Sequence, residues 1–398
     1  VEYGFLGTYN KNKKSPFETF YMGGDGMSGY SSTYAQETIG LRGYENGSIA
    51  GNGGYNSYGY AYSRLAMELR YPFLLEPSST IYGLVFVEAG NAWTDLKNLK
   101  IIESALEKTT DTKALIIGVG AMKRTPEMFS QLFPGRTAVI VADQNTWDIA
   151  AEEVAGSMEQ AGIPMVEPFI FQDRNIFAEW SFVEELEAAL GQSDAIPVAV
   201  GAGVVNDLTK LVSEHLGRRY MIVATTVSMD GFSAYGASVI KDGFKRTFDC
   251  RAAYGIIVDP AVAAKAPKYL AVSGYADLLA KIPAGADWIV ADAMGCENLD
   301  EFAWHLVQDG LRDSLSAPEA VYNGEVPAIK SLAQELILSG FAMQSCQSSR
   351  PASGTEHLFG HYWEMTDLSY TGKEEVPGFE TGKSFLSEGR RVPHGFAV

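Results

Sequence analysis

The chain has 398 residues, of which 46% are hydrophobic, so it is long enough for two or three domains with buried cores. Its formal net charge of −18 argues against a nucleic-acid partner, because phosphate backbones recruit basic patches. Cys250, Cys296 and Cys346 give no disulfide framework and predict reduced thiols.

Residues 1–98 are rich in Tyr, Gly, Ser and Asn and follow the two-residue period of β-strands. Between Arg64 and Tyr71, apolar side chains alternate cleanly with charged ones. Such a strand suits a transmembrane barrel with lipid outside and a polar lumen inside. An amphipathic strand of a soluble sandwich would show the same alternation.

Two segments further along the chain each consist of a short apolar run followed by polar or glycine residues, a pattern typical of strand ends. Ala138–Ala142 reads as a strand that ends in Asp143-Gln-Asn145-Thr146, where Asp143 could meet an adenosine ribose. Ile196–Val200 reads as another strand. It leads into Gly201, Ala202 and Gly203, and the sequence predicts a helix over Asp207–Leu216.

A strand that enters a helix through a glycine turn offers backbone N–H groups and a positive dipole end to a pyrophosphate. The same turn is often only a tight connection. The segment Ala224–Gly231, ATTVSMDG, adds the hydroxyls of Thr225, Thr226 and Ser228, and the carboxylate of Asp230, at a further strand end.

The C-terminal third contains residues of the types that bind metal ions. GYADLLAK, Gly274–Lys281, sets Asp277 and Lys281 on one helix face. SRPASGTEHLFGHYWEM, Ser349–Met365, spans about four helical turns and places His357 and His361 at i, i+4. With His394, these residues could form a Zn²⁺ or other divalent site with an open position, or could be ordinary surface groups.

Four segments carry a family resemblance: GAGVVND, TTVSMDG, GYADLLAK and SRPASGTEHLFGHYWEM. Their order resembles the sn-glycerol-1-phosphate dehydrogenase family, in the superfamily of iron-containing alcohol dehydrogenases and dehydroquinate synthases. The resemblance implies an α/β Rossmann-like nucleotide-binding domain followed by an all-α metal-binding domain. The implied reaction interconverts dihydroxyacetone phosphate and sn-glycerol 1-phosphate, a small-molecule substrate pair.

The resemblance also implies site residues. Asp277, His357 and His394 match the ligands of one Zn²⁺ or Ni²⁺ ion, and Asp230, Asp277 and His361 match substrate contacts. Catalytic candidates are Asp277, His361 and Lys281. The cofactor, NAD(H) or NADP(H), would lie over Asp143, Asn145, Thr146, Gly201, Ala202, Gly203, Asp207, Thr225, Thr226 and Ser228.

A phosphate dianion needs paired cations, so Lys245 and Arg350 are the candidates for the substrate phosphate. Either could instead be solvated. A glycerol dehydrogenase of the same superfamily would not need them. A dehydroquinate-synthase-like lyase would need more basic residues.

The segments ETIGLRGYENGS and YPFLLEPSSTIYGLVFVEAGNAW resemble the Omp85 family of outer-membrane assembly proteins. In that family the loop arginine, here Arg42, reaches into the barrel wall. The resemblance implies an antiparallel β fragment of a transmembrane β-barrel, and it gives the alternative function of an outer-membrane barrel assembly component.

The predicted domains are a partial barrel over 1–98, a Rossmann-like domain over 99–258 and a helical domain over 259–398. The resemblance of the dehydrogenase part predicts a cytoplasmic location, whereas that of residues 1–98 predicts a location in the bacterial outer membrane. The start at Val1, without a signal peptide, and the stop soon after His394 predict a fused or mis-joined reading frame with a truncated enzyme. The polar stretch Thr366–Arg391 puts His394 in question as a ligand. The oligomeric state, a homo-oligomer included, stays open.

Overall fold

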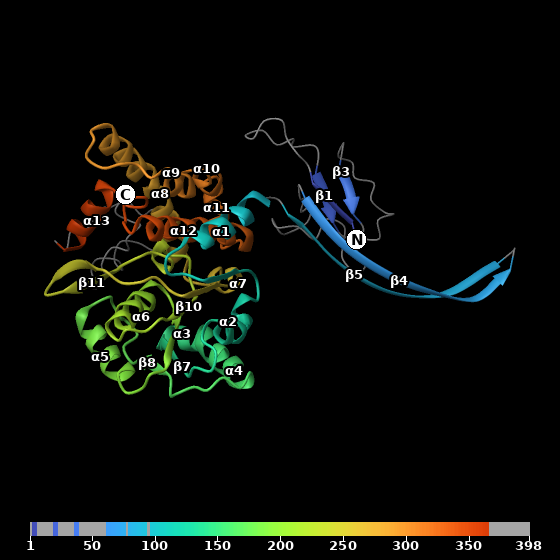
Figure 1. Ribbon diagram of the computed structural model, residues 1–398, viewed down its shortest axis with the longest axis horizontal. Coiled ribbons are helices and arrows are strands. Elements are labelled where there is room, and N and C mark those ends of the chain that lie inside the picture. The colour runs from blue at the N-terminus through green and yellow to red at the C-terminus, as the bar shows by residue number, and fades with distance from the viewer. Residues whose placement is uncertain are drawn as a thin grey trace. The chain divides into compact units, whose positions relative to one another are not determined.

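The computed structural model describes residues 2–5, 19–22, 36–39, 61–76, 79–93 and 96–365, with side chains throughout 101–360 and at a few earlier positions. The chain divides into two compact units, Val1–Ile101 and Ile102–Val398. Helix α1 (Leu96–Lys108) spans the division between them. Figure 1 labels the elements of both units.

The first unit is built around a long antiparallel hairpin. β4 (Ala61–Glu76) pairs with β5 (Ser79–Trp93), and β1 (Glu2–Phe5) pairs with β4 in the antiparallel sense. β2 (Thr19–Met22) and β3 (Gln36–Ile39) form a separate parallel pair. The strand predicted between Arg64 and Tyr71 is therefore confirmed. That this unit derives from a barrel wall stays a prediction, and Arg42 lies outside the described residues.

Polar and apolar side chains of this hairpin separate as the alternation predicts. Arg64 forms an ion pair of 3.1 Å with Glu88 across the two strands. The Glu88 side chain is only 1% exposed, whereas Leu65 and Met67 are 46% and 68% exposed. The Arg64–Glu88 pair is thus more covered than Leu65 and Met67, whereas Glu68, on the same face as Arg64, is exposed.

The second unit contains a parallel six-stranded sheet in the order β6-β13-β10-β9-β7-β8. Four strands are buried along their whole length, as expected for apolar runs in a parallel sheet that is covered on both faces. The strands predicted at Ala138–Ala142 and Ile196–Val200 are confirmed. The bounds are β6 (Ala114–Ile117), β7 (Ala138–Asp143), β8 (Phe169–Phe171), β9 (Ile196–Gly201), β10 (Met221–Ala224) and β13 (Gly255–Val258).

Helices cover both faces of this sheet. α2 (Thr125–Leu132) and α4 (Glu152–Gln160) lie on one side, and α5 (Trp180–Leu190) and α6 (Gly203–His215) lie on the other (Figure 1). The strand order reverses between β7 and β9, since β8 lies beyond β7 whereas β10 and β13 follow β9 on the other side. Ligands of open α/β sheets bind at such a reversal, outside the carboxyl ends of the strands.

The start of α6 corrects one prediction. The sequence placed the helix at Asp207–Leu216, but it begins at Gly203. Val204 and Val205 are β-branched, which masks a helix start, and Ala202 at the N-cap has no side chain that could signal one.

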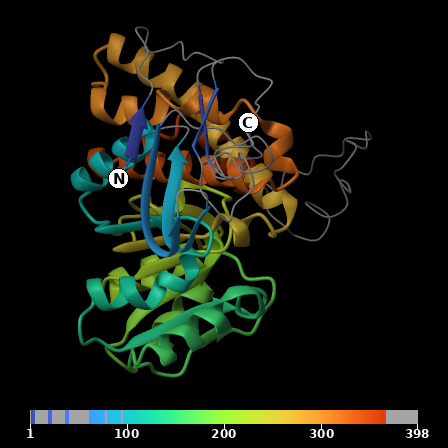
Figure 2. The ribbon, with the colours of Figure 1, turned by 90° about the vertical axis from the view of Figure 1, so that its right-hand side faces the viewer.

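A hairpin and a group of helices complete the unit. Figures 1 and 2 show that α8 to α13 gather at one end of the sheet. α12 is apolar on most sides and buried along most of its length, as expected for a central helix. The bounds are α3 (Gln144–Thr146), β11 (Ala237–Lys241), β12 (Phe244–Phe248), α7 (Pro260–Ala263), α8 (Lys268–Ala293), α9 (Glu301–Gln308), α10 (Leu311–Ser314), α11 (Pro318–Tyr322), α12 (Val326–Cys346) and α13 (Thr355–Met365).

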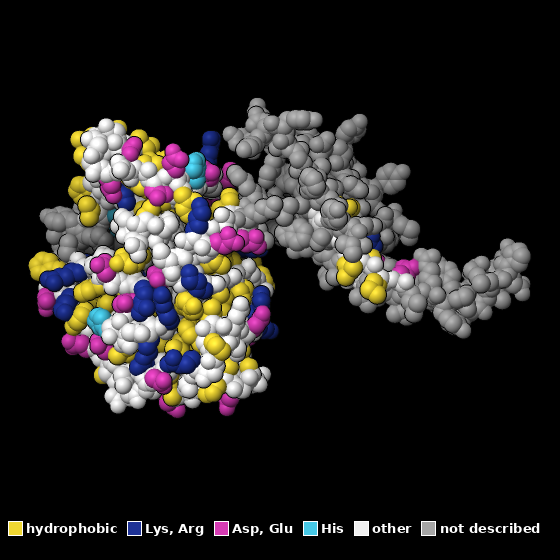
Figure 3. Space-filling view, in the orientation of Figure 1, with side chains coloured by type: hydrophobic (Ala, Val, Ile, Leu, Met, Phe, Trp, Pro, Cys, Tyr) yellow, Lys and Arg dark blue, Asp and Glu magenta, His cyan; other side chains and the backbone are white. Residues whose placement is uncertain are grey.

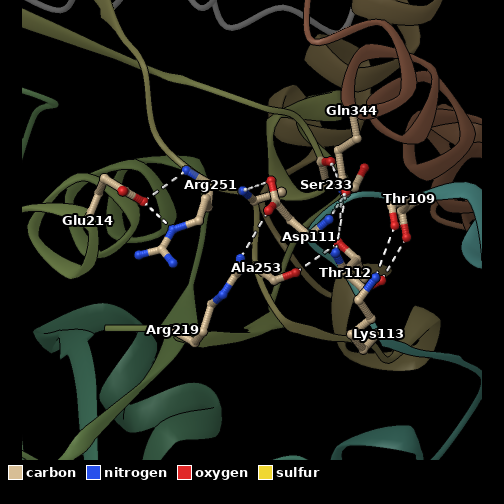
Figure 4. Close-up of polar contacts among 11 residues, drawn as sticks. Thr109, Asp111, Thr112, Lys113, Glu214, Arg219, Ser233, Arg251, Ala253 and Gln344 are labelled. Carbon is tan, nitrogen blue, oxygen red and sulfur yellow. Dashed lines mark hydrogen bonds and ion pairs between the residues drawn. The ribbon is translucent and has the colours of Figure 1, made fainter. Parts of the chain in front are cut away.

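A buried polar network fastens α12 to the sheet (Figure 4). The Gln344 side chain accepts hydrogen bonds from the backbone amides of Asp111 and Thr112 and donates to the Thr112 hydroxyl and the Ser233 carbonyl. Asp111 in turn pairs with Arg219 at 3.0 Å. Because every one of these groups is satisfied, the network fixes the helical part against the nucleotide-binding part.

The surface carries both signs of charge, and the face in Figure 3 shows Lys and Arg side chains among acidic ones. Cys250, Cys296 and Cys346 are free thiols, as predicted. Among the helices of the described residues, none combines the length and apolarity needed to cross a lipid bilayer.

Candidate active site

The glycine turn after β9 forms one wall of the site. A Cβ at Gly201 would lie 2.7 Å from the Val205 Cβ, so this position requires glycine, whereas a Cβ at Gly203 would meet only the flexible end of the Met229 side chain, at 2.6 Å. Ala202 has extended backbone and gives α6 no side-chain cap. The first-turn N–H groups of α6 and its positive dipole end are therefore available to an anionic ligand.

Asp143, at the end of the neighbouring strand β7, caps the short helix α3. Its carboxylate accepts a hydrogen bond of 2.8 Å from the Thr146 amide, and the Thr146 hydroxyl accepts one of 3.1 Å from the Asp143 amide. Both residues are 7% exposed. Asn145 exchanges two hydrogen bonds with Arg174. Three of the residues predicted to bind the cofactor, Asp143, Asn145 and Thr146, thus lie together at the edge where the strand order reverses.

The end of β10 brings three hydroxyls to the same edge, since parallel strands end together. The hydroxyls of Thr226 and Ser228 lie 3.2 Å apart. The Thr225 hydroxyl is buried and has no hydrogen-bond partner among the described residues. A buried hydroxyl without a partner is costly, so Thr225 marks a place where a ligand would supply the missing bond.

A buried ion cluster forms the opposite wall. Lys281, which is 0% exposed, lies 2.7 Å from the Asp230 carboxylate and 2.8 Å from that of Asp277. The second Asp277 oxygen accepts a hydrogen bond of 2.9 Å from the Asp230 amide, and the Ser339 hydroxyl donates one of 2.9 Å to Asp230. One ammonium is thus shared between two carboxylates from different elements.

Electrostatics in this cluster follow from burial and the shared charge. Desolvation, together with the nearby Asp230 carboxylate, raises the pKa of Asp277 to about 6. Desolvation also opposes ionisation of Asp230, but the Lys281 ammonium outweighs it and lowers the Asp230 pKa. Desolvation disfavours the Lys281 ammonium, and the two carboxylates outweigh it and raise the Lys281 pKa.

His357, on α13, is kept neutral beside this cluster. Desolvation lowers the pKa of His357 to about 4, with further lowering by the Lys281 and Lys245 ammonium groups. A neutral imidazole keeps a lone pair with which it can bind a metal ion or accept a proton. α13 spans Thr355–Met365, so His357 and His361 lie on one helix as their spacing predicts, whereas the segment before Thr355, which contains Pro351, is not part of it.

A cleft of about 730 Å³ joins the two walls. Asp207 is part of its lining. Burial raises the pKa of Asp207 to about 6. The lining also includes Arg350, which pairs with Glu297 at 2.9 Å and donates a hydrogen bond to the Asp287 carbonyl. The predicted residues that line it are Ala202, Gly203, Asp207, Ser228, Asp230, Lys245, Asp277, Arg350 and His357.

Two predicted residues fall where side chains are not described. His361 lies on α13, but its side chain is outside the described residues, and so is the whole of His394. Among the side chains that the structure describes, no three His, Cys, Asp or Glu groups lie close enough together to hold a metal ion.

Comparison with known proteins gives matches in both parts of the chain. The family model described as iron-containing alcohol dehydrogenase matches residues 116–267, and the Omp85 superfamily domain matches residues 1–122. The glycerol-1-phosphate dehydrogenase (NAD(P)+) of Bacillus velezensis is 31% identical over 283 residues, which are 70% of this chain and 71% of that protein. The chain belongs to the glycerol-1-phosphate dehydrogenase family.

Another family member, from Halalkalibacterium halodurans, is 32% identical over 61% of this chain, and the match spans 61% of that protein's length. Among solved structures, glycerol dehydrogenase from Schizosaccharomyces pombe aligns with a TM-score of 0.53 and 19% identity, covering 65% of each chain. A probable glycerol dehydrogenase from Sinorhizobium meliloti 1021 aligns with a TM-score of 0.52 and 19% identity, covering 63% of this chain and 69% of that one. The structural likeness shows the fold: a parallel sheet with a helical C-terminal part.

The names of these glycerol-1-phosphate dehydrogenases specify NAD(P)+, and the residues of this chain fit a dinucleotide. The N-terminus of α6, which has no side-chain cap, offers its backbone N–H groups to a phosphate. The Thr225 hydroxyl is buried and has no hydrogen-bond partner among the described residues, so a bound cofactor could supply one.

For a metal ion, the described donors are of the right chemical type. A carboxylate and a neutral imidazole, from Asp277 and His357, are groups that borderline divalent ions take. Both Asp277 oxygens are already bonded, one by Lys281 and one by the Asp230 amide. An ion at this carboxylate would therefore share it with an ammonium.

Sequence reasoning missed Ser339 and Lys210. Ser339 lies on α12, 109 residues from the carboxylate it binds, and no local pattern marks it. Lys210 is 1% exposed and donates to the carbonyls of Gly231, Ala234 and Gly236, so it holds the segment that follows Asp230 against α6. Its place next to the turn, on the buried face of α6, was the only available signal.

Proposed function

We propose that the second unit is an NAD(P)H-linked oxidoreductase that interconverts dihydroxyacetone phosphate and sn-glycerol 1-phosphate. The observation that carries this proposal is the cleft that joins the N-terminus of α6 to the Asp230–Lys281–Asp277 cluster. Reduction of a carbonyl requires a surface that binds the dinucleotide and, opposite it, buried groups that can act as acid and base.

On the cofactor side, the first turn of α6 would bind the pyrophosphate, and Gly201, Ala202 and Gly203 would let it approach. Asp207, Thr225, Thr226 and Ser228 would direct the nicotinamide half, and Asp143, Asn145 and Thr146 the adenosine half. The bound nicotinamide supplies the hydride. The buried walls of the cleft would keep water from the reacting atoms.

On the catalytic side, Asp277, His357 and His394 would hold one Zn²⁺ or Ni²⁺ ion, which supplies Lewis-acid polarisation of the carbonyl when bound. Lys281 would orient the Asp277 carboxylate through their hydrogen bond of 2.8 Å. His361 would hold the proton that reaches the substrate oxygen, and Asp230 would contact the substrate from the other side of Lys281.

The substrate phosphate separates this proposal from glycerol dehydrogenase, the alternative within the superfamily. Lys245 influences the pKa of both Asp207 and His357, so it lies near the two walls of the cleft. Arg350 lines the cleft but is paired with Glu297, and a phosphate would compete with that carboxylate. Loss of turnover with the phosphorylated ketone in Arg350→Ala is what a phosphate role predicts, whereas a glycerol enzyme would be indifferent.

The decisive test is oxidation of NADH and NADPH by the full chain with dihydroxyacetone phosphate, before and after removal of divalent ions by a chelator. Turnover is expected to depend on Zn²⁺ or Ni²⁺ and to fall at least about a hundredfold in His357→Ala, since even changes outside the first ligand sphere cost 10- to 100-fold. The matched control is His305→Ala, which removes an exposed histidine that pairs with Asp309. A folded, cofactor-binding protein with no turnover would contradict the assigned substrate.

For the first unit, we propose that residues 1–98 derive from an outer-membrane barrel of the Omp85 type. The match over residues 1–122 and the exposed apolar side of β4 support this. The domain limits 99–258 and 259–398, and a cytoplasmic place for the enzyme, belong to the same proposal. Expression of the full chain is expected to leave it in a detergent-extractable fraction if residues 1–98 engage lipid, and recovery in plain buffer would count against a membrane role.

A further inference from the structure

Lys281 supplies a buried positive charge between two acidic side chains. Its ammonium lies 2.7 Å from the Asp230 carboxylate and 2.8 Å from the Asp277 carboxylate, and its side chain is 0% exposed. Asp277 lies on α8, four residues before Lys281, whereas Asp230 begins the short 3₁₀ helix Asp230–Phe232 after β10. One ammonium therefore joins two segments that are distant in the sequence.

The other hydrogen bonds of this cluster come from neutral groups. The Asp230 amide donates to the second oxygen of Asp277 at 2.9 Å, and the Ser339 hydroxyl donates to the Asp230 carboxylate at 2.9 Å. Among the described residues, Lys281 is the cation that forms ion pairs with these two carboxylates. When all three groups are ionised, the cluster keeps one negative charge in excess, and without the ammonium it would have two.

The ammonium has two opposite effects on a divalent cation at Asp277 and His357, which both line the cleft. It repels a second positive charge, and this repulsion is strong where burial lowers the local dielectric constant. It also occupies one oxygen of Asp277 with a hydrogen bond. In the absence of the ion, however, the same ammonium neutralises carboxylates that would otherwise be buried without a counter-charge.

We propose that Lys281 is a built-in counter-ion that keeps the site folded without a metal ion and lowers the affinity of the site for a divalent cation. This inference rests on the proposed function, because it takes Asp277 and His357 as metal ligands. Lys281 acts through the Asp277 carboxylate, so it is a positioning residue and not a ligand. A chain without the ammonium binds the ion more tightly, because the ion then supplies the missing positive charge.

The test is titration of the full, chelator-treated chain with Zn²⁺ in competition with a chromogenic chelator, which reports the Kd for zinc without any turnover. Lys281→Gln keeps a hydrogen-bond donor but removes the charge, and its Kd is expected to fall at least about tenfold. Asp230→Asn removes one negative charge and leaves the ammonium to Asp277, so its Kd is expected to rise about tenfold. A merely structural disturbance of the cluster would weaken zinc binding in both variants.

Thermal unfolding with and without Zn²⁺ gives a second readout. A ligand that binds the folded chain stabilises it more as its Kd falls, so zinc is expected to raise the unfolding midpoint of Lys281→Gln more than that of wild type. If Lys281→Gln folds only with zinc, the ion has replaced the ammonium, which supports the inference. If it folds in neither condition, the Kd of Asp230→Asn decides.

Two controls complete the experiment. Lys265→Met removes an exposed lysine just before α8 and is expected to leave the Kd unchanged, and His357→Ala measures the zinc that is held elsewhere on the chain. A Kd of Lys281→Gln equal to or above that of wild type overturns the inference but leaves the proposed function intact, and so does a Kd of Asp230→Asn equal to or below it. A folded wild-type chain that binds zinc no better than His357→Ala overturns the proposed metal site and the inference with it.

Discussion

Replacement of Lys281 by methionine is expected to lower the free energy of unfolding of the second unit by about 3–5 kcal/mol, the cost of breaking a buried ion pair. The Lys281 ammonium is fully buried and lies within 2.8 Å of two carboxylates. Without it, Asp230 and Asp277 would face each other with no compensating charge. Urea denaturation followed by tryptophan fluorescence measures the change.

Two further variants sharpen this result. Lys265→Met removes an exposed lysine just before the same helix and is expected to change the free energy of unfolding by no more than about 0.5 kcal/mol. The double variant Lys281→Met with Asp230→Asn is expected to recover part of the loss, since only one buried carboxyl remains to be neutralised. If Lys281→Met were as mild as Lys265→Met, the cluster would not have the energetic role described above.

Gly274→Ala is expected to be the second severe substitution, costing about 3 kcal/mol, at the upper end for overpacking. The new Cβ would overlap the backbone carbonyl of Val227, which cannot rotate away as a side chain can. α8 would then move away from the segment that follows β10, and the hydrogen bond from the Asp230 amide to the Asp277 carboxylate would lengthen. The same denaturation assay, together with the proposed turnover, measures both effects.

The matched control is Gly156→Ala in α4. A Cβ at Gly156 meets nothing within 4 Å, and its backbone is helical. Alanine there is expected to stabilise the protein by about 0.5–1 kcal/mol, because glycine loses more chain entropy on folding. A Gly274→Ala variant with the stability of wild type would mean that α8 is not held against Val227 as closely as described.

Local patterns predicted most of the elements that carry the candidate site. Apolar runs followed by polar residues located β7 and β9, since a strand buried in a parallel sheet needs an apolar side chain at nearly every position. The i, i+4 spacing placed Asp277 and Lys281 on one helix face, and their hydrogen bond is present. The start of α6 was missed because alanine and β-branched residues give no capping signal.

The sequence by itself determined the family, the strand ends and the residue types of the site. These can be read from short motifs and from the order of apolar and polar residues along the chain. Only the tertiary structure decided that Lys281 lies between two carboxylates, one of them from Asp230, which lies 51 residues earlier in the chain, and that Ser339 completes the cluster.

 The physical reason is that burial and long-range pairing depend on how distant elements pack, and packing sets the dielectric around each charge. The pKa of Asp277 and the neutrality of His357 are therefore properties of the fold and not of the motifs that contain these residues.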